Sequence, residues 1–196
     1  MTLLFLFILS LCSHFREARM NSEPFGLHEG QTRSSMNLPL NLLGSQYYSV
    51  PSVPKPDSDF TRYYATVGEQ TGLCMISAAT PQFENDPKGI VVREKMDVMG
   101  SRLRDIYGAF VKHDVMRENA LWTRPDDWLM AVQQGEREYE LRWPSLSGGK
   151  VGAGIAQIVL RAAAAGPDRS VILLSYRFDN YSRCQAEQAV PKISKQ

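Results

Sequence analysis

The apolar positions along this chain follow the two-residue period of strands, change to a helical period, and then return to the strand period. Short alternating or continuous apolar runs between turn residues are typical of β-strands. We expect strands over Gln46–Val53, Phe60–Val67, Leu73–Ala79, Arg137–Trp143, Ile155–Arg161 and Val171–Phe178. The second and third runs are joined by a short Gly-containing loop, which favours an antiparallel hairpin.

Between the two groups of strands, apolar side chains recur at spacings of three and four residues. They are Val92, Met96, Met99, Leu103, Ile106 or Tyr107, and Phe110. This spacing predicts an amphipathic helix of about five turns, with His113 and Asp114 near its end. Two short helices are also expected, one after Thr32 and one over 128–131 that is capped by Asp126–Asp127 and stopped by Gly135. The predicted fold class is α+β: an antiparallel sheet of about five or six strands packed against one long amphipathic helix, with one or two short helices.

The N-terminal segment differs in composition from the rest of the chain. Residues Leu3–Cys12 form a continuous apolar run that is too short to span a bilayer and has the length of a signal-peptide core. We therefore expect a signal peptide or leader over 1–19, a single α+β domain over 20–184 and a polar C-terminal tail over 185–196. Two alternatives remain open: lipidation at Cys12, and a cytoplasmic protein that starts at Met20.

Charge narrows the range of partners. The chain has 43% apolar and 22% charged residues and a formal net charge of +1. Without residues 1–19, which carry two arginines and one glutamate, the charges balance. Because binding to nucleic acid or to an anionic membrane surface requires clustered Lys and Arg, neither partner is expected. No transmembrane span is expected once the signal is removed.

The three cysteines permit one internal bridge. If Cys12 leaves with the leader, Cys74 and Cys184 remain, about 110 residues apart. In an oxidising compartment, a disulfide closing such a long loop contributes about 4–5 kcal/mol in the chain-entropy model. The alternative is a pair of buried thiols in a reduced protein. No CxxC spacing occurs and the three histidines are scattered, so we predict no metal site.

The sequence contains no recognisable catalytic motif. The segment Ser147–Gly154 lacks the order of a phosphate-binding loop and is interpreted as a flexible hairpin loop. We assign no catalytic residue and no cofactor. A hydrolase or ligand carrier remains the alternative, with a site assembled from scattered residues such as His113, Asp126 and Glu138.

Aromatic residues are the best candidates for a binding surface, because aromatic side chains dominate interface energetics. The candidates are Trp122, Trp128, Trp143 and Tyr63. For each single residue, packing in the core of a small domain is the competing interpretation.

An ordered set of short motifs extends from Phe25 to Cys184. It consists of Phe25-Gly26-Leu27 with Gly30-Gln31-Thr32, Val53-Pro54-Lys55-Pro56 with Phe60, Gly72-Leu73-Cys74-Met75-Ile76, and Tyr176-Arg177-Phe178-Asp179-Asn180 before Cys184. The set resembles an uncharacterised family of bacterial extracytoplasmic proteins with FGLxxGMT, VPKPHxxF, GLCKI and YEFKNxxxC motifs. The resemblance implies export and pairing of Cys74 with Cys184, and it implies no catalytic residues.

These observations favour a non-enzymatic extracytoplasmic protein that binds another envelope macromolecule. An inhibitor or immunity role and an accessory role in envelope assembly both fit this expectation. The expected location is periplasmic or otherwise extracytoplasmic.

Overall fold

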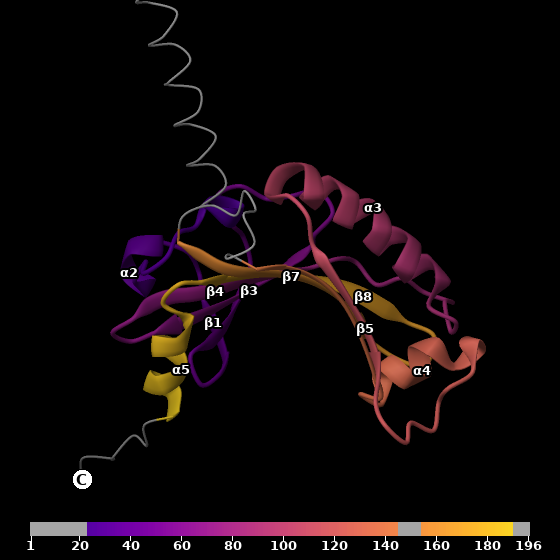
Figure 1. The fold of residues 1–196 in the computed structure, drawn as a ribbon. Coiled ribbons are helices and arrows are strands. Elements are labelled where there is room, and N and C mark those ends of the chain that lie inside the picture. Colours follow the sequence, from indigo (N-terminus) through magenta and orange to yellow (C-terminus); the bar gives the residue numbers. More distant parts are fainter. Residues whose placement is uncertain (1–22, 145–153, 190–196) are drawn as a thin grey trace, which may run out of the picture.

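The computed structural model describes residues 23–144 and 154–189. The predicted leader over 1–19, nearly all of the loop Ser147–Gly154 and the last residues of the predicted tail lie outside the described residues. The fold is α+β, and its main element is an antiparallel sheet that arches below helix α3 (Figure 1).

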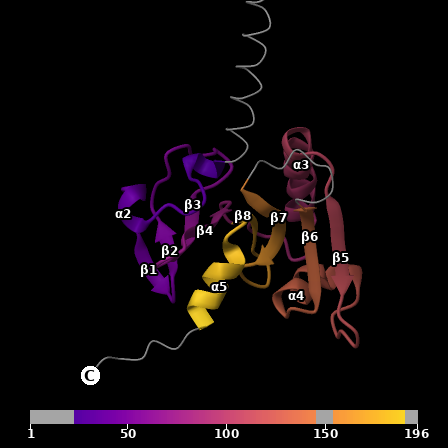
Figure 2. The same cartoon turned by 60° about the vertical axis from the view of Figure 1, so that its left-hand side comes forward.

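The sheet has eight strands in the order β1-β2-β3-β4-β8-β7-β6-β5, and every neighbouring pair is antiparallel. Their bounds are β1 Asn41–Gly44, β2 Tyr47–Val50, β3 Arg62–Gly68, β4 Gly72–Ala79, β5 Val111–Met116, β6 Arg137–Pro144, β7 Ile155–Ala164 and β8 Ser170–Phe178. Figure 2 shows β1 and β5 at the opposite edges of the sheet.

The prediction of five or six strands is wrong because β1 and β5 were not recognised. Strand β1 pairs with β2 across a tight turn in which Gln46 has φ 58°. Strand β5 follows directly after the long helix, and Phe110 continues the helical spacing by coincidence. His113 and Asp114 therefore lie in the edge strand β5 and not near the end of the helix.

Helix α3 spans Ile90–Tyr107, and it buries Val92, Met96, Met99 and Leu103 of the predicted stripe. Its first turn is held by the Asp86 carboxylate, which accepts hydrogen bonds from the backbone N–H groups of Ile90 and Val92. It ends before Gly108, whose φ of 87° is readily adopted only by glycine.

The other helices are short. They are η1 Pro24–Gly26, α2 Arg33–Met36, η2 Pro125–Asp127, α4 Trp128–Gln133 and α5 Tyr181–Ala189. The side chain of Thr32 caps α2 by accepting from the Ser35 N–H. The predicted capping of α4 by Asp127 is wrong, because the Asp127 carboxylate binds Arg124. The start of the predicted polar tail, 185–189, is part of α5.

The hydrophobic core lies between the sheet and the elements on the α3 side. On β6, Tyr139, Leu141 and Trp143 are buried, and the ring of Tyr139 contacts Trp128 of α4 edge to face. The alternate residues of β6 point to the opposite side of the sheet. We call this opposite side the inner face; on β6 it carries Glu138, Glu140 and Arg142. Figure 1 shows α5 on the opposite side of the arched sheet from α3.

Candidate functional site

The inner face holds a cavity of about 430 Å³ over the middle of the sheet. Strands β6, β7 and β8 form most of its floor, with contributions from β2, β3, β4 and α5. The lining side chains are Tyr47, Tyr64, Met75, Ser77, Glu138, Glu140, Arg142, Gln157, Val159, Arg161, Leu173, Ser175, Arg177 and Tyr181. We refer to it as the inner-face cavity.

The two-residue period of strands brings these side chains together. Arginine ends an alternating triplet on each of three neighbouring strands: Glu138-x-Glu140-x-Arg142, Gln157-x-Val159-x-Arg161 and Leu173-x-Ser175-x-Arg177. Strand register then aligns the triplets, with Glu140 opposite Arg161 and Gln157 opposite Arg177. Three positive and two negative side chains thus come to one side of the sheet from distant parts of the sequence.

Glu140 is the centre of a charge network at one end of the cavity. Although its side chain is only 10% exposed, its carboxylate lies 2.6 Å from Nε of Arg142 and 3.9 Å from Nη1 of Arg161. Arg142 also reaches the more exposed Glu138 at 3.7 Å. A partly buried carboxylate requires such partners, because the loss of hydration is otherwise uncompensated.

Arg177 lies further along the strands than Glu140, in the register row of Gln157, and it has different partners. Its Nη1 donates a hydrogen bond of 2.8 Å to Oε1 of Gln157, and its guanidinium lies 5.1 Å from the ring centroid of Tyr181. Its Nε is buried and has no hydrogen-bond partner in the described part of the chain. In the described part of the chain, neutral groups hold Arg177 in place.

Hydroxyl groups complete the lining on the β2–β4 side. Tyr47 and Tyr64 stack with ring centroids 5.7 Å apart, and Oγ of Ser77 lies 2.9 Å from Oγ of Ser175. Desolvation, reinforced by the neighbouring Tyr64, raises the pKa of Tyr47 above its usual value. The Tyr47 phenol is therefore protonated near neutral pH and available as a hydrogen-bond donor.

The residues proposed for the hydrolase alternative are only partly brought together. His113 of β5 lies 3.3 Å from Glu138, and both belong to the inner face. Asp126 lies elsewhere, 2.9 Å from Lys88. A triad of these three residues is therefore not formed, and residues 23–144 and 154–189 contain no cluster of three or more His, Cys, Asp or Glu that could hold a metal ion.

Three of the four predicted binding aromatics are core residues. Trp143 packs against Phe110 and donates from Nε1 to the Gly108 carbonyl oxygen, while Trp128 and Tyr63 are also buried. Trp122 is half-buried in the loop after β5, where the Glu136 carboxylate accepts its backbone N–H. No ring contact joins any two of the four among the described residues, and a shared binding role for them stays a prediction.

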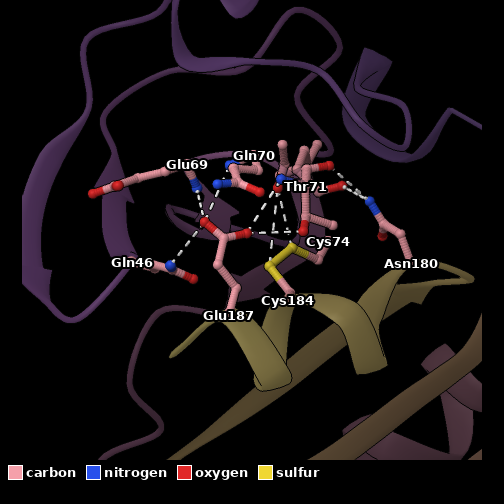
Figure 3. Close-up of a disulfide and its surroundings, with 10 residues drawn as sticks. Gln46, Glu69, Gln70, Thr71, Cys74, Asn180, Cys184 and Glu187 are labelled. Atoms are coloured by element: carbon pink, nitrogen blue, oxygen red, sulfur yellow. Dashed lines mark hydrogen bonds between the residues drawn. A yellow bond between two sulfur atoms is a disulfide. The ribbon is translucent and has the colours of Figure 1, made fainter. Parts of the chain in front are cut away.

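Helix α5, which carries Tyr181, is fastened to the β3–β4 hairpin at two points (Figure 3). A disulfide joins Cys184 of α5 to Cys74 of β4, with Cα atoms 6.3 Å apart. One turn further along, the Glu187 carboxylate accepts hydrogen bonds from the backbone N–H groups of Glu69, Gln70 and Thr71 and from the Thr71 hydroxyl. These contacts fix the position of Tyr181 at the rim of the cavity.

Glu187 should make stability depend on acid pH. Partial desolvation raises the pKa of Glu187, but the hydrogen bonds from Thr71, Gln70 and Glu69 lower it more, so the folded-state pKa lies below the ordinary value of 4.5. The stabilisation is complete above the unfolded-state pKa and is lost as the pH falls through the folded-state pKa. We expect Glu187→Gln to reduce the free energy of unfolding by about 1 kcal/mol at pH 7, after discounting for solvent exposure.

Urea unfolding of both proteins between pH 7 and pH 3 would test this expectation. The difference between wild type and Glu187→Gln should shrink below about pH 4. Glu94→Gln, which changes an exposed carboxylate of α3, is the matched control and should leave stability nearly unchanged. A difference that persists unchanged at pH 3 would contradict the role of the ionised carboxylate.

Comparison with protein families, curated proteins and solved structures found no match for this chain. No helix in the described part of the chain is long and apolar enough to cross a membrane. The inner face and the disulfide are the features of the structure that bear on function.

The sequence did contain a signal for the inner-face cavity. The Glu-x-Glu-x-Arg alternation in the predicted strand over 137–143 places three charges on one face, and the same period puts Arg161 and Arg177 on one face of their strands. Sequence reasoning considered Glu138 only as one of the scattered candidates for a hydrolase or ligand-carrier site. It could not align these residues, because strand order and register are not local properties.

Proposed function

We propose that this chain is an extracytoplasmic protein that binds another envelope macromolecule through the inner face of its sheet. The observation that carries the proposal is the inner-face cavity, a polar concavity with three arginines, two glutamates and two stacked tyrosines. Tyrosine and arginine side chains are enriched in protein–protein interfaces.

The disulfide supports the proposed location. Disulfides persist in oxidising compartments and are rare in the cytosol, and Cys74 pairs with Cys184. The resemblance of the motif set to an extracytoplasmic family points in the same direction. Within this class, an inhibitor or immunity protein and an assembly accessory factor are the two roles that we propose, and both require a partner on the inner face.

A ligand carrier is the second candidate. The cavity volume of about 430 Å³ lies within the range of small-molecule sites. A carrier would hold a small molecule there and would present no inner-face contact to a macromolecule. The two candidates therefore differ in what the inner face touches inside the cell.

Site-specific photo-crosslinking separates the two functions. A photoreactive amino acid at Leu173, which lines the cavity without contributing charge, should crosslink to a discrete macromolecule in cells that express the native chain. The same amino acid at Val98, which is 63% exposed on α3, is the control and should not give that product. Products at neither position, or the same products at both, would contradict the proposed binding function.

The ligand-carrier candidate has its own measurement. Native mass spectrometry of protein purified from its own host should show no retained small molecule if the partner is a macromolecule. A stoichiometric mass increment that disappears on denaturation would favour the carrier.

A further inference from the structure

Arg177 differs from Arg124 and Arg137 in what the Nε–Nη2 edge of its guanidinium group contacts. Arg124 and Arg137 each direct Nε and Nη2 at a carboxylate, Arg124 at Asp127 with 2.8 and 3.1 Å and Arg137 at Asp114 with 2.8 and 2.9 Å. This two-donor edge matches the two oxygens of a carboxylate. In Arg177 the equivalent edge has no carboxylate among the described residues.

The two acidic residues that line the cavity already have other partners. Glu140 is paired with Arg142 and Arg161, and Glu138 with His113 and Arg142. Among the described residues, the polar and ring partners of Arg177 are the neutral groups of Gln157 and Tyr181. Its positive charge is therefore uncompensated at one end of the cavity.

Burial makes this arrangement costly. The Nε atom of Arg177 is buried and donates to no described residue. A buried donor without an acceptor loses its hydration and gains nothing in return, and the loss is larger for a charged group. Natural proteins rarely retain such a group without a ligand or partner that satisfies it.

We propose that Arg177 is a receptor for a carboxylate side chain of the partner protein, bound through its Nε–Nη2 edge in the inner-face cavity. This inference rests on the proposed function and names the chemistry of the partner: an acidic residue inserted at Arg177. Tyr47 lies on the same register row as Arg177 and Ser175 on the neighbouring row, and both line the cavity beside the inserted side chain. The ring of Tyr181 lies over the guanidinium, so insertion turns this ring aside.

A carboxylate fits the cavity better than a phosphate group does. Glu138 and Glu140 also line the cavity, and they repel a doubly charged anion more than a singly charged one. Arg124 and Arg137 already bind carboxylates through their guanidinium groups in this fold. The inner face is thus complementary to a single acidic side chain among polar neighbours.

Nuclear magnetic resonance tests the proposal with defined probes. The Nε–H signal of Arg177 in the ¹⁵N-labelled full chain should shift saturably on titration with acetyl-Ala-Glu-Ala-amide. The matched peptide acetyl-Ala-Gln-Ala-amide should bind about tenfold more weakly, because it lacks the charge. No shift of the Arg177 signal, equal binding of the two peptides, or tighter binding of inorganic phosphate would overturn the proposal.

Variants link the binding to Arg177 itself. Arg177→Gln should abolish the response of the remaining cavity signals, whereas Arg169→Gln, an exposed arginine outside the cavity, should leave it unchanged. Tyr181→Ala keeps Arg177 and removes the covering ring, so it should bind the Glu peptide at least as tightly as wild type. Weaker binding by Tyr181→Ala in a folded protein would overturn the proposed route of insertion.

The failure of this inference is distinguishable from the failure of the proposed function. If the Leu173 crosslink persists in Arg177→Gln, a macromolecule binds the inner face without using Arg177, and the inference is wrong. If the Glu peptide binds at Arg177 but Leu173 gives no crosslink, the carboxylate belongs to a free small molecule, and the proposed function is wrong.

Discussion

Removal of the Cys74–Cys184 disulfide is expected to lower the free energy of unfolding by about 4–5 kcal/mol. The bond closes a loop of 110 residues, and in the chain-entropy model the stabilisation arises because this loop is constrained in the unfolded chain. For a domain of this size, the loss corresponds to a melting temperature lower by about 10–20 °C. Thermal unfolding of wild type and of the double variant Cys74→Ala/Cys184→Ala would measure it.

A control separates the bond from the packing of the two side chains. Both cysteines are fully buried, so the alanine variant also loses sulfur contacts. Wild-type protein reduced without alkylation retains the sulfur atoms and loses only the bond. If reduced and oxidised wild type have the same melting temperature, the disulfide contributes nothing to stability. Helix α5 would then be held by Glu187 and by Asn180, which donates from Nδ2 to the Leu73 carbonyl oxygen.

Gly72→Ala is expected to destabilise the protein by about 3–4 kcal/mol for two separate reasons. Gly72 has φ 74°, a conformation that costs an alanine about 1–2 kcal/mol. An added Cβ would also collide with the backbone of Gly30. This segment is held at Leu73 by two hydrogen bonds, from the Gly30 N–H to the Leu73 carbonyl oxygen and from the Leu73 N–H to the Gln31 carbonyl oxygen. The N-terminal segment would have to leave the start of β4, with loss of its packing.

Gly135→Ala provides the matched control for this prediction. Gly135 has φ 67°, but the space around its Cβ position is open, so the variant carries the conformational cost alone. Urea unfolding of both variants should show Gly72→Ala to be the less stable by about 2 kcal/mol. Equal destabilisation would show that docking of residues 30–31 onto β4 contributes nothing.

Local patterns predicted the elements whose side chains are buried on one side. The Val92, Met96, Met99 and Leu103 stripe forms α3 as expected, because helical spacing and burial coincide there. The strands over 60–67 and 73–79 form the β3–β4 hairpin, which is closed by the pair Gly68 and Gly72. The disulfide between Cys74 and Cys184 is present, as the resemblance implied.

Local patterns did not predict the edge strand β5 or the helix α5. Strand β5 is exposed at four of its six positions and has no apolar alternation, so its pairing with β6 defines it. Helix α5 has a single buried residue, Cys184, and its polar surface indicated a tail. Tertiary contacts at the disulfide and at Glu187 hold this helix, and no local pattern reports them.

The sequence by itself determined the α+β class, the long helix, the central hairpin and the pair of cysteines, because each depends on spacing along the chain or on composition. Only the tertiary structure decided that Glu140, Arg161 and Arg177 share one cavity and that Trp128 and Trp143 belong to the core. The reason is physical: strand register and strand order determine which alternating residues become neighbours, and both depend on contacts between distant segments.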